Sequence, residues 1–357
     1  MDITCVVMAG GKGERFWPKS RTHLPKQFLN ISGSKSMLQQ SIARLELITE
    51  IEKIFVVTNE LYAELIKAQI PHLPHENIII EPVGRNTAPC IGLASLIIEE
   101  RYPESTMVVV PSDHIIGNEQ GFVQIIRTAV EVAGDKHLVT LGIKPTYPET
   151  GYGYIKSSSV DAVVNDLEVH RVERFVEKPN HELAVKYVDS GSYYWNSGMF
   201  VWKLSTIRRS IQELMPDLHD VLETMKSAFE TDNRQQVIKE EFYKMPDQSI
   251  DYGIMEKSEN ILMIPCMFEW DDVGSWTALD RIHERDEDGN IIKGNILSLD
   301  TKRCIIESNG KLIATLGIED LIIVDTEDVT LICAKDKAQE IKLLLKELRV
   351  QKLDQYL

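Results

Sequence analysis

Cysteine is scarce in this sequence and is never clustered. The five cysteines stand at positions 5, 90, 266, 304 and 333, an odd number with no two close together. This spacing suggests neither a disulfide framework nor the paired-cysteine pattern of a zinc site. It favours a reducing compartment, and we therefore expect a cytoplasmic protein.

Long apolar runs and an excess of positive charge are lacking too. No hydrophobic run approaches the roughly 20 residues that a transmembrane helix needs, and strand-like residues begin at Ile3 without a basic leader. The formal net charge is −16. A chain this acidic has no general attraction for nucleic acid or for an anionic membrane, and we expect neither as a partner. Any anion it binds must be held by a local cluster of cations.

What the sequence does contain is a strand–helix alternation over its first part. Runs rich in Val and Ile, which we expect to be strands, stand at 3–10, 53–59, 77–82, 106–114 and 137–143. Segments of helical spacing lie between them. Near-continuous apolar strands separated by helices are typical of an α/β fold, a mostly parallel sheet with helices on both faces. After Asp286, short β runs alternate with Asn-Gly and Asp turns, and a helical segment closes the sequence. We predict a large domain over 1–286 and a small β-rich domain over 287–357 that ends in a helix.

The stretch "VVMAGGKGERFWPKSRTHLPKQF" (6–28) combines a strand end, glycines and many cations. It is not a P-loop, because Gly13 is followed by Glu14 and Arg15 instead of Lys and Ser or Thr. It is not a dinucleotide fingerprint either, because Phe16 replaces the third glycine. A glycine turn at the carboxyl end of a strand can still present N–H groups to an anion, and Arg or Lys adds charge-assisted hydrogen bonds. We favour phosphate binding here over a solvated basic turn.

Two acidic turns are candidates for a cation site. Asp113 ends the apolar strand of "VVVPSDH", and Asp271 and Asp272 stand in "WDDVGSW". Mg²⁺ favours one or two carboxylates together with substrate phosphates. Aspartate is also common in ordinary turns, and spacing alone does not show that residues 113 and 272 meet.

Other candidates are weaker when each is taken alone. Glu81 could accept hydrogen bonds from a guanine edge or could face water, and Asn86 or Thr87 could cap the following helix. Lysine and glutamate of "VERFVEKP" (172–179) could contact a phosphate and sugar hydroxyls, although charged strand ends are common. "GYGY" (151–154) could admit a ligand or bend. The stretch "WNSGMFVWK" (195–203) looks like a short strand, although "WNSGMF" (195–200) is also interpreted as a tight turn between strands.

Taken together and in this order, these segments resemble the sugar-phosphate nucleotidyltransferases. Their amino-acid motifs are similar to those of the bacterial-type mannose-1-phosphate guanylyltransferases. The matching segments span nearly all of residues 6–276 and are "MAGGKGERFWPKSR", "PKQF", "EPVGRNTAP", "PSDH", "GYGYI", "VERFVEKP", "WNSGMF", "SIDYGIMEK" and "WDDVGSW". The resemblance implies a Rossmann-like catalytic domain and a C-terminal domain like a short left-handed β-helix.

The resemblance also implies a reaction and roles for residues. GTP and α-D-mannose 1-phosphate would give GDP-mannose and pyrophosphate with Mg²⁺ as cofactor, by in-line attack of the sugar phosphate on the α-phosphorus. Arg15 and Lys26 would be catalytic, and Asp113 and Asp272 would hold the metal. The nucleotide would be bound by Ala9, Gly10, Gly11, Gly13, Glu81, Asn86 and Thr87. The sugar phosphate would be bound by Gly153, Glu177, Lys178 and Asn196.

Three further expectations concern the limits of this resemblance. Longer relatives carry a phosphomannose isomerase domain, and we expect no isomerase activity from a chain that ends at Leu357. A uridylyl- or thymidylyltransferase and a catalytically silent nucleotide-sugar sensor are the rival hypotheses. A homodimer formed through the C-terminal domain is a further expectation.

Overall fold

The computed structural model describes residues 2–357, and the chain divides into two compact units. Unit 1 comprises Met1–Gly10, Ser41–Ser112 and Ile116–Trp270, and unit 2 comprises Gly11–Gln40, Asp113–Ile115 and Asp271–Leu357. Contacts thus group most of the glycine loop (residues 6–28), together with the acidic turns at Asp113 and at Asp271–Asp272, with the C-terminal residues. The division of the sequence at residue 286 stays a prediction.

Unit 1 is built on a nine-stranded sheet with the order β3-β2-β1-β4-β9-β6-β10-β8-β7. Only β8 and β9 run against the other strands, so the predicted mixed, mostly parallel sheet is confirmed. Its strands are β1 (Ile3–Met8), β2 (Ile54–Asn59), β3 (Ile78–Glu81), β4 (Thr106–Pro111), β6 (Leu138–Ile143), β7 (Tyr154–Val164), β8 (Leu167–Val176), β9 (Tyr193–Lys203) and β10 (Ile261–Cys266).

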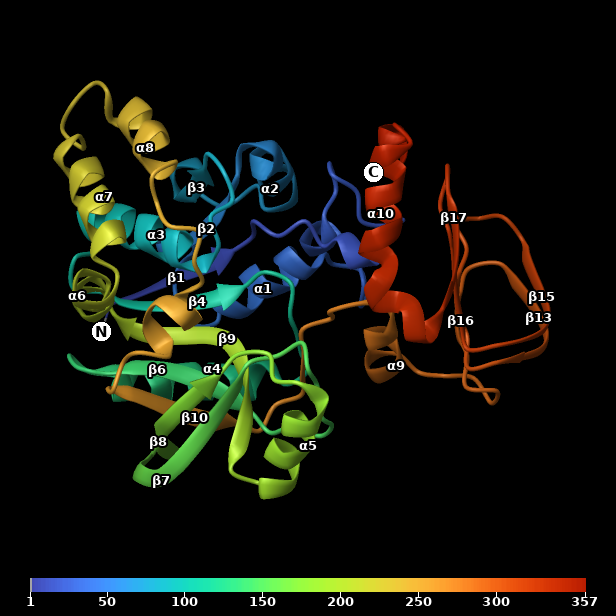
Figure 1. Ribbon diagram of the computed structural model, residues 1–357. Coiled ribbons are helices and arrows are strands. Elements are labelled where there is room, and N and C mark those ends of the chain that lie inside the picture. Colours follow the sequence, from blue (N-terminus) through green and yellow to red (C-terminus); the bar gives the residue numbers. More distant parts are fainter. Residues whose placement is uncertain (1) are drawn as a thin grey trace. The chain divides into compact units, whose positions relative to one another are not determined.

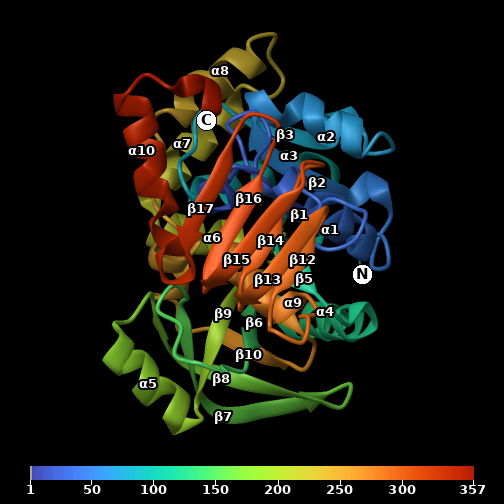
Figure 2. The ribbon, with the colours of Figure 1, turned by 90° about the vertical axis from the view of Figure 1, so that its right-hand side faces the viewer.

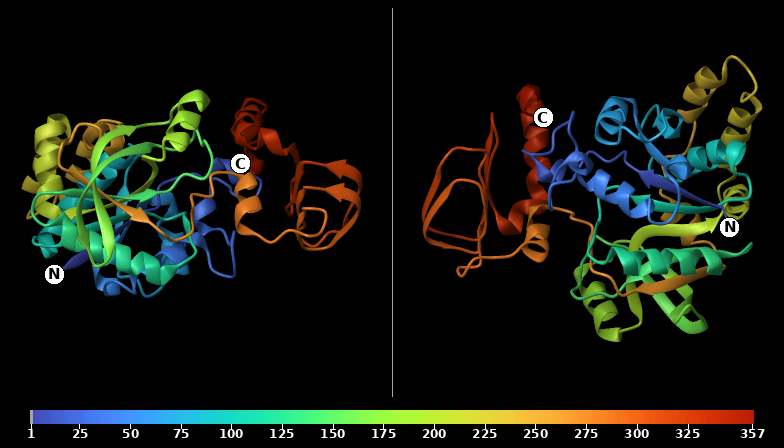
Figure 3. Two further views of the ribbon diagram at one scale, coloured as in Figure 1. Left: turned by 90° about the horizontal axis from the view of Figure 1, so that it is seen from below. Right: turned by 180° about the vertical axis from the view of Figure 1, so that it is seen from behind.

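Helices cover both faces of this sheet (Figures 1 and 3). The central strands are apolar on both faces, as a doubly covered sheet requires. The helices that belong to unit 1 are α2 (Ala63–Gln69), α3 (Thr87–Arg101), α4 (Glu119–Ala133), α5 (His181–Ser190), α6 (Leu204–Leu214), α7 (Pro216–Ser227) and α8 (Arg234–Phe242). A π-helical turn follows at Asp251–Met255. Within residues 2–357, none of the helices is both long enough and apolar enough to span a bilayer.

Three elements of unit 1 differ from the sequence prediction. Helices α5 and α8 were not predicted, and few of their side chains are buried: Ala184 in α5, and Ile238 and Phe242 in α8. The segment 195–200 lies inside β9, so the strand expected over 195–203 is confirmed and the tight turn is wrong. Gly198 there has φ +68°, and the pairing of β9 with β6 shifts register nearby, so this glycine marks an irregularity within the strand.

Unit 2 carries the predicted small β region, which is β-helix-like (Figure 2). The chain alternates between a sheet of β12 (Ile291–Lys293), β14 (Ile305–Glu307), β16 (Leu321–Asp325) and β17 (Thr330–Ala334) and a pair of β13 (Ile296–Lys302) and β15 (Ile313–Glu319). All pairings except β16–β17 are parallel. Cys304, Ile306 and Ile323 fill the interior between the two layers.

The glycine loop is packed into the main core of unit 2. Phe16 and Trp17 lie in one apolar cluster with Trp276, Ile305 and Ile341, the last from helix α10 (Ile341–Val350). The indole N–H of Trp276 donates to the Trp17 carbonyl at 3.1 Å. The remaining α-helices and β-strands are α1 (Met37–Leu45), α9 (Leu279–Ile282) and two short strands, β5 (Ile115–Ile116) and β11 (Trp270–Asp271). The loop residues are therefore held by the same core that supports α10.

Candidate functional site

Gly13 brings the loop after β1 into direct contact with Lys26. Its φ is +59°, in the left-handed region that favours glycine. A Cβ at this position would lie 2.3 Å from the Lys26 Cβ and 2.8 Å from the Lys26 amide nitrogen. The Ser20 hydroxyl donates to the Gly13 carbonyl at 2.8 Å. Only glycine therefore allows the turn to close on the lysine.

Lys26 is a buried cation that joins the two acidic turns. Its residue is 4% exposed, and its Nζ donates to Asp113 Oδ2 at 2.9 Å and to the Asp272 carbonyl at 2.6 Å. Burial raises the pKa of Asp113, but the positive charges of Lys26 and His114 outweigh it, and the pKa lies below its ordinary value. The Asp113 carboxylate is therefore ionised at neutral pH. The structure brings residues 113 and 272 to one ammonium group, which sequence spacing could not show.

The two adjacent aspartates after β11 have different surroundings. Asp271 is buried and forms a bidentate ion pair with Arg281, at 2.5 Å to Nε and 3.0 Å to Nη2. Asp272 accepts from the Gly274 amide at 3.1 Å and lines a cavity of about 330 Å³. Of the two aspartates, Asp272 is the one that lines the cavity, and its choice as a metal ligand stays a prediction.

That cavity is rich in cations. Lys12, Arg15, Lys26 and Lys342 line it together with Gly13 and Asp272. Glu14 also lines it, but this carboxylate pairs with Arg349 at 2.9 Å. Within residues 2–357, none of Lys12, Arg15 and Lys342 has a carboxylate at ion-pair distance, although the chain carries a net charge of −16. A concave site lined by unneutralised cations is suited to a polyanion.

Glu81 lies in unit 1 at the end of β3 and is almost completely buried. Its Oε1 has no hydrogen-bond partner among the described residues, and a Cβ on Gly10 would come within 3.3 Å of Oε2. Burial raises the pKa of this carboxyl to about 7, against a smaller opposing effect of the Cys90 thiol. Ala9, next to Gly10, is tied to β2 by its amide, which donates to the Val57 carbonyl at 2.8 Å. A buried acceptor without a donor is suited to a ligand that supplies one.

Asn86 and Thr87 have clear structural roles at the start of α3. Asn86 has φ +68°, and its side chain accepts from the Thr87 amide at 3.0 Å, so Asn86 is the N-cap. The Thr87 hydroxyl accepts from the Ile250 amide at 2.8 Å. These contacts support the capping interpretation and leave base contacts a prediction.

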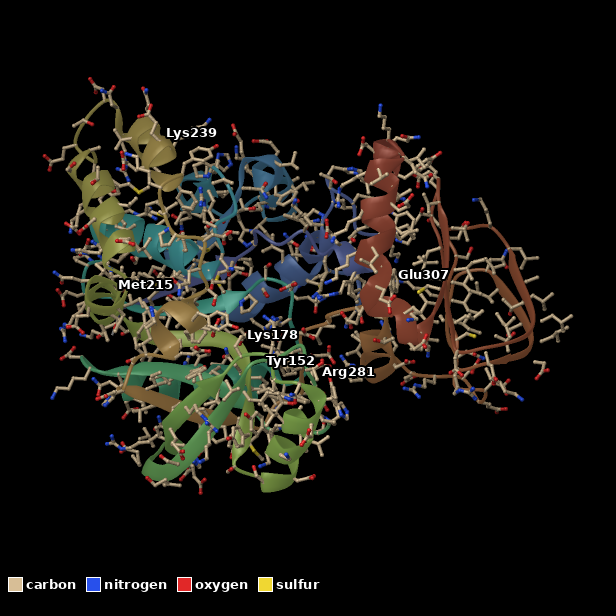
Figure 4. All side chains as sticks on the ribbon, in the orientation of Figure 1. Tyr152, Lys178, Met215, Lys239, Arg281 and Glu307 are labelled. Atoms are coloured by element: carbon tan, nitrogen blue, oxygen red, sulfur yellow. The ribbon has the colours of Figure 1, made fainter. Side chains whose placement is uncertain are left out.

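The four predicted sugar-phosphate residues lie together in unit 1. The Asn196 amide donates to the Gly153 carbonyl at 2.8 Å, and a Cβ on Gly153 would lie 2.5 Å from Glu177 Oε2. Lys178 pairs with Glu177 at 2.7 Å and has φ +45°, a conformation that costs a non-glycine residue about 1–2 kcal/mol. In Figure 4, Lys178 lies at the same end of the unit 1 sheet as Tyr152, which precedes β7.

Asp251 completes this cluster and was not predicted. Its Oδ1 accepts from the Asn196 side-chain amide at 2.7 Å. Burial raises the pKa of Asp251 to about 6, with a further contribution from the negative charge of Glu177. The residue stands in "SIDYGIMEK", so the segment was noticed in the sequence, but nothing there distinguished its aspartate.

Comparisons with known proteins show the family to which this chain belongs. A family model described as nucleotidyl transferase matches residues 4–289. A mannose-1-phosphate guanylyltransferase of Escherichia coli strain K12 is 40% identical over 349 residues, which cover 96% of this chain and 73% of that protein. The chain belongs to the nucleotidyl transferase family, among the mannose-1-phosphate guanylyltransferases.

Further comparisons extend the likeness to the C-terminal part. A protein of the same name from Klebsiella pneumoniae is 41% identical over 356 residues, covering 98% of this chain and 75% of that protein. A crystal structure described as a mannose-1-phosphate geranyltransferase from Thermus thermophilus matches with a TM-score of 0.89 at 32% identity, covering 98% of this chain and 100% of that one. A model of the MannoseP isomerase/GMP-like beta-helix domain matches residues 294–348.

For a nucleotidyl transferase, the structure groups the predicted residues into three sets. Gly11, Gly13, Arg15, Lys26, Asp113 and Asp272 belong to unit 2, whereas Glu81 with Gly10 and the sugar-phosphate cluster are two sets within unit 1. Sequence reasoning missed Lys12, Gly274, Lys342 and Asp251. Lys12 and Gly274 stand inside quoted motifs, but Lys342 lies in the closing helix, where no motif indicated a site.

Proposed function

We propose that this nucleotidyl transferase moves GMP from GTP to α-D-mannose 1-phosphate, giving GDP-mannose and pyrophosphate. The observation that supports this most is Lys26, a buried ammonium that contacts both acidic turns and lines a cavity together with Lys12, Arg15 and Lys342. The names of the two bacterial relatives support the choice of sugar phosphate and base.

The cavity of unit 2 is proposed to bind the triphosphate. In-line attack of the sugar phosphate on the α-phosphorus expels pyrophosphate and forms no covalent bond to the enzyme. Negative charge grows on the oxygen that bridges the α- and β-phosphates and on the non-bridging oxygens, so fixed cations stabilise the transition state more than the ground state. Lys26 is placed near the α-phosphate in this proposal, and Arg15 near the β- and γ-phosphates. The Gly11–Gly13 turn supplies backbone N–H groups.

Asp113 and Asp272 are proposed to hold Mg²⁺. Their donor set fits this ion, because Mg²⁺ takes one or two carboxylates and completes its octahedron with substrate phosphates and water. Among residues 2–357 no cluster of three or more acidic, histidine or cysteine side chains is arranged to hold a metal alone, which suits an ion that arrives with GTP. The bound ion would neutralise developing phosphate charge.

The cluster of Gly153, Glu177, Lys178 and Asn196 is proposed to bind mannose 1-phosphate. The Lys178 ammonium is more than half exposed and can exchange Glu177 for the sugar phosphate. Glu177 and the second N–H of the Asn196 amide then face hydroxyls, and the absent Cβ of Gly153 leaves room for the Glu177 carboxylate.

Glu81 is proposed to select guanine. The guanine edge offers two donors, N1–H and the 2-amino group, and adenine lacks both on that edge. The unpartnered Oε1 of Glu81 is a suitable acceptor for them. Ala9 and Gly10, and Asn86 and Thr87, then shape the approach to this carboxyl.

One experiment tests the whole proposal. Pyrophosphate release is measured with mannose 1-phosphate and each of GTP, ATP, UTP and dTTP, with and without Mg²⁺. We expect release with GTP and Mg²⁺ only. A clear preference for UTP or dTTP would support the rival sugar nucleotidyltransferase, and no release with any nucleotide would support a silent sensor.

The homodimer is proposed to form through the β13–β15 pair of unit 2. Leu297, Leu299 and Leu316 on these two strands are 55%, 60% and 74% exposed. Adjacent exposed leucines on paired strands form an apolar face of the kind that association covers. The cytoplasmic location and the absence of isomerase activity stay predictions.

A further inference from the structure

Lys342 reaches the phosphate cavity from a helix that no motif connects with it. It stands in the first turn of α10 and lines the cavity together with Arg15 and Lys26. Nearly 320 residues of sequence separate it from the loop, yet all three residues belong to unit 2. The cavity is thus built from the glycine loop, an acidic turn and the C-terminal helix.

Helix α10 is fixed firmly against the loop. Ile341 and Leu345, one turn apart, are each 3% exposed and share an apolar core with Phe16. Farther along the helix, Arg349 pairs with Glu14 at 2.9 Å. The chain after α10 returns to the same place, where the Tyr356 carbonyl accepts from the Trp17 indole at 2.6 Å. These contacts hold the backbone that carries Lys342 in a defined position beside the loop.

Within residues 2–357, the Lys342 ammonium forms no ion pair, whereas nearby lysines do. Lys335 forms an ion pair with Asp280 at 2.8 Å, and Lys337 pairs with Glu340 at 2.8 Å. Lys342 has no carboxylate at ion-pair distance within the described residues, and neither have Lys12 and Arg15 in the same cavity. Like charges gathered in one cavity repel one another, so a bound anion would stabilise the arrangement.

We propose that Lys342 is a phosphate-binding residue that contacts the β- and γ-phosphates of GTP and, equally, the pyrophosphate product. This inference rests on the proposed function, because it assigns the cavity to the triphosphate. It makes α10 part of the nucleotide site. The small β domain then contributes to substrate binding as well as to folding.

The test compares two lysines of one helix. Lys342→Gln removes the cavity charge, whereas Lys346→Gln removes the same charge one turn later, from an exposed residue that does not line the cavity. The two lysines are i,i+4 neighbours, so either substitution relieves the same repulsion within the helix. Losing one charge-assisted contact should raise the KM for GTP about tenfold in Lys342→Gln only. The KM for mannose 1-phosphate should stay unchanged, and Lys342→Arg should restore most of the GTP affinity.

Direct binding separates this inference from the proposed function. Pyrophosphate binding to the full chain is measured calorimetrically, without turnover, for the wild type and both glutamine variants. If the wild type forms no GDP-mannose but binds pyrophosphate about tenfold more tightly than Lys342→Gln, the function is wrong and the phosphate role of Lys342 stands. If Lys342→Gln and Lys346→Gln bind pyrophosphate equally well, or the wild type does not bind it, the inference is overturned.

Discussion

At the scale of single residues, Gly13 is the position where the site tolerates least change. Gly13→Ala would combine a left-handed φ with a Cβ 2.3 Å from that of Lys26, and backbone atoms of residue 26 lie nearly as close. The loop must therefore shift, and Lys26 with it. We expect kcat/KM for GDP-mannose synthesis to fall by about a hundredfold or more, since misplacement of a catalytic group by about 1 Å has that effect.

Gly33 is the matched control for this substitution. It also has a left-handed φ, +78°, but a Cβ there would meet nothing within 4 Å. Both alanine variants should lose about 1–2 kcal/mol of stability from backbone strain. Only Gly13→Ala should lose activity in the steady-state assay, and an equal loss in both would show that strain alone is responsible.

Glu81 should give the reaction a pH dependence near neutrality. Burial raises its pKa to about 7, so the carboxyl is neutral and a poorer acceptor below that pH and ionised above it. The KM for GTP should fall as the pH rises from about 6 to about 8, and Glu81→Gln should remove this dependence. Asp251 has a pKa of about 6, so it titrates in the same pH range. Wild type and variant are therefore compared at each pH, and the KM for mannose 1-phosphate is measured in parallel.

The same shift affects stability with the opposite sign. The folded protein keeps the Glu81 proton up to about pH 7, whereas an unfolded chain releases it near 4.5. The free energy of unfolding should therefore fall as the pH rises through this window. Glu81→Gln should weaken that fall in denaturant titrations. If the free energy of unfolding of Glu81→Gln falls with pH as steeply as that of the wild type, Glu81 has its ordinary pKa in the folded protein.

Residue types and spacing predicted the glycine loop and the charged strand ends, but they could not supply distances. The encounter of Asp113 with Lys26 depends on the fold, because 87 residues separate them. Asp251 looked like any other aspartate, since only its burial beside Asn196 makes it unusual. Sequence thus indicated which chemistry was available, and tertiary structure decided which groups meet.

At the scale of elements, the turn after β11 assigns different tasks to two neighbouring aspartates. Asp272→Asn should abolish Mg²⁺-dependent turnover with little change in stability, because its carboxylate lines the cavity. Asp271→Asn should instead lower the free energy of unfolding by about 1–2 kcal/mol, because it breaks a partly exposed bidentate pair with Arg281. Activity with varied Mg²⁺ and thermal melting of both variants distinguish the two roles, and the reverse pattern would exchange the assignment.

Elements with a strong apolar pattern were predicted well, and polar ones were not. The strands β1, β2 and β4 are apolar on both faces and were recognised directly. Helix α8 has a weak apolar stripe, and only Ile238 and Phe242 are buried in it, so its sequence gave little helical periodicity. The segment 195–200 looked like a turn because of its Gly and Asn, although in β9 Gly198 marks only an irregularity in the strand.

At the scale of the whole molecule, the net charge predicted no general attraction for nucleic acid or anionic membranes, but it could not predict where the chain binds anions. The charge of −16 coexists with a cavity in unit 2 lined by four basic side chains. That cavity is lined by residues 12–16 and 26, by the turn at Asp272 and Gly274, and by Lys342 near the end of the sequence. Lys342 therefore could not be found by reading any single segment, and the C-terminal helix looked like a simple closing element.

The apolar face of the small β domain leads to a prediction about assembly. If Leu299 and Leu316, which are 60% and 74% exposed, meet a second copy of the chain, burying two lysines in their place is unfavourable. Sedimentation should give about twice the chain mass of 40.6 kDa for the wild type and the chain mass itself for Leu299→Lys/Leu316→Lys. Val163→Lys, at a position 66% exposed in β7, is the control and should leave the mass doubled. A wild type that sediments at the chain mass, or a double variant that still sediments at twice that mass, would exclude this face as the interface.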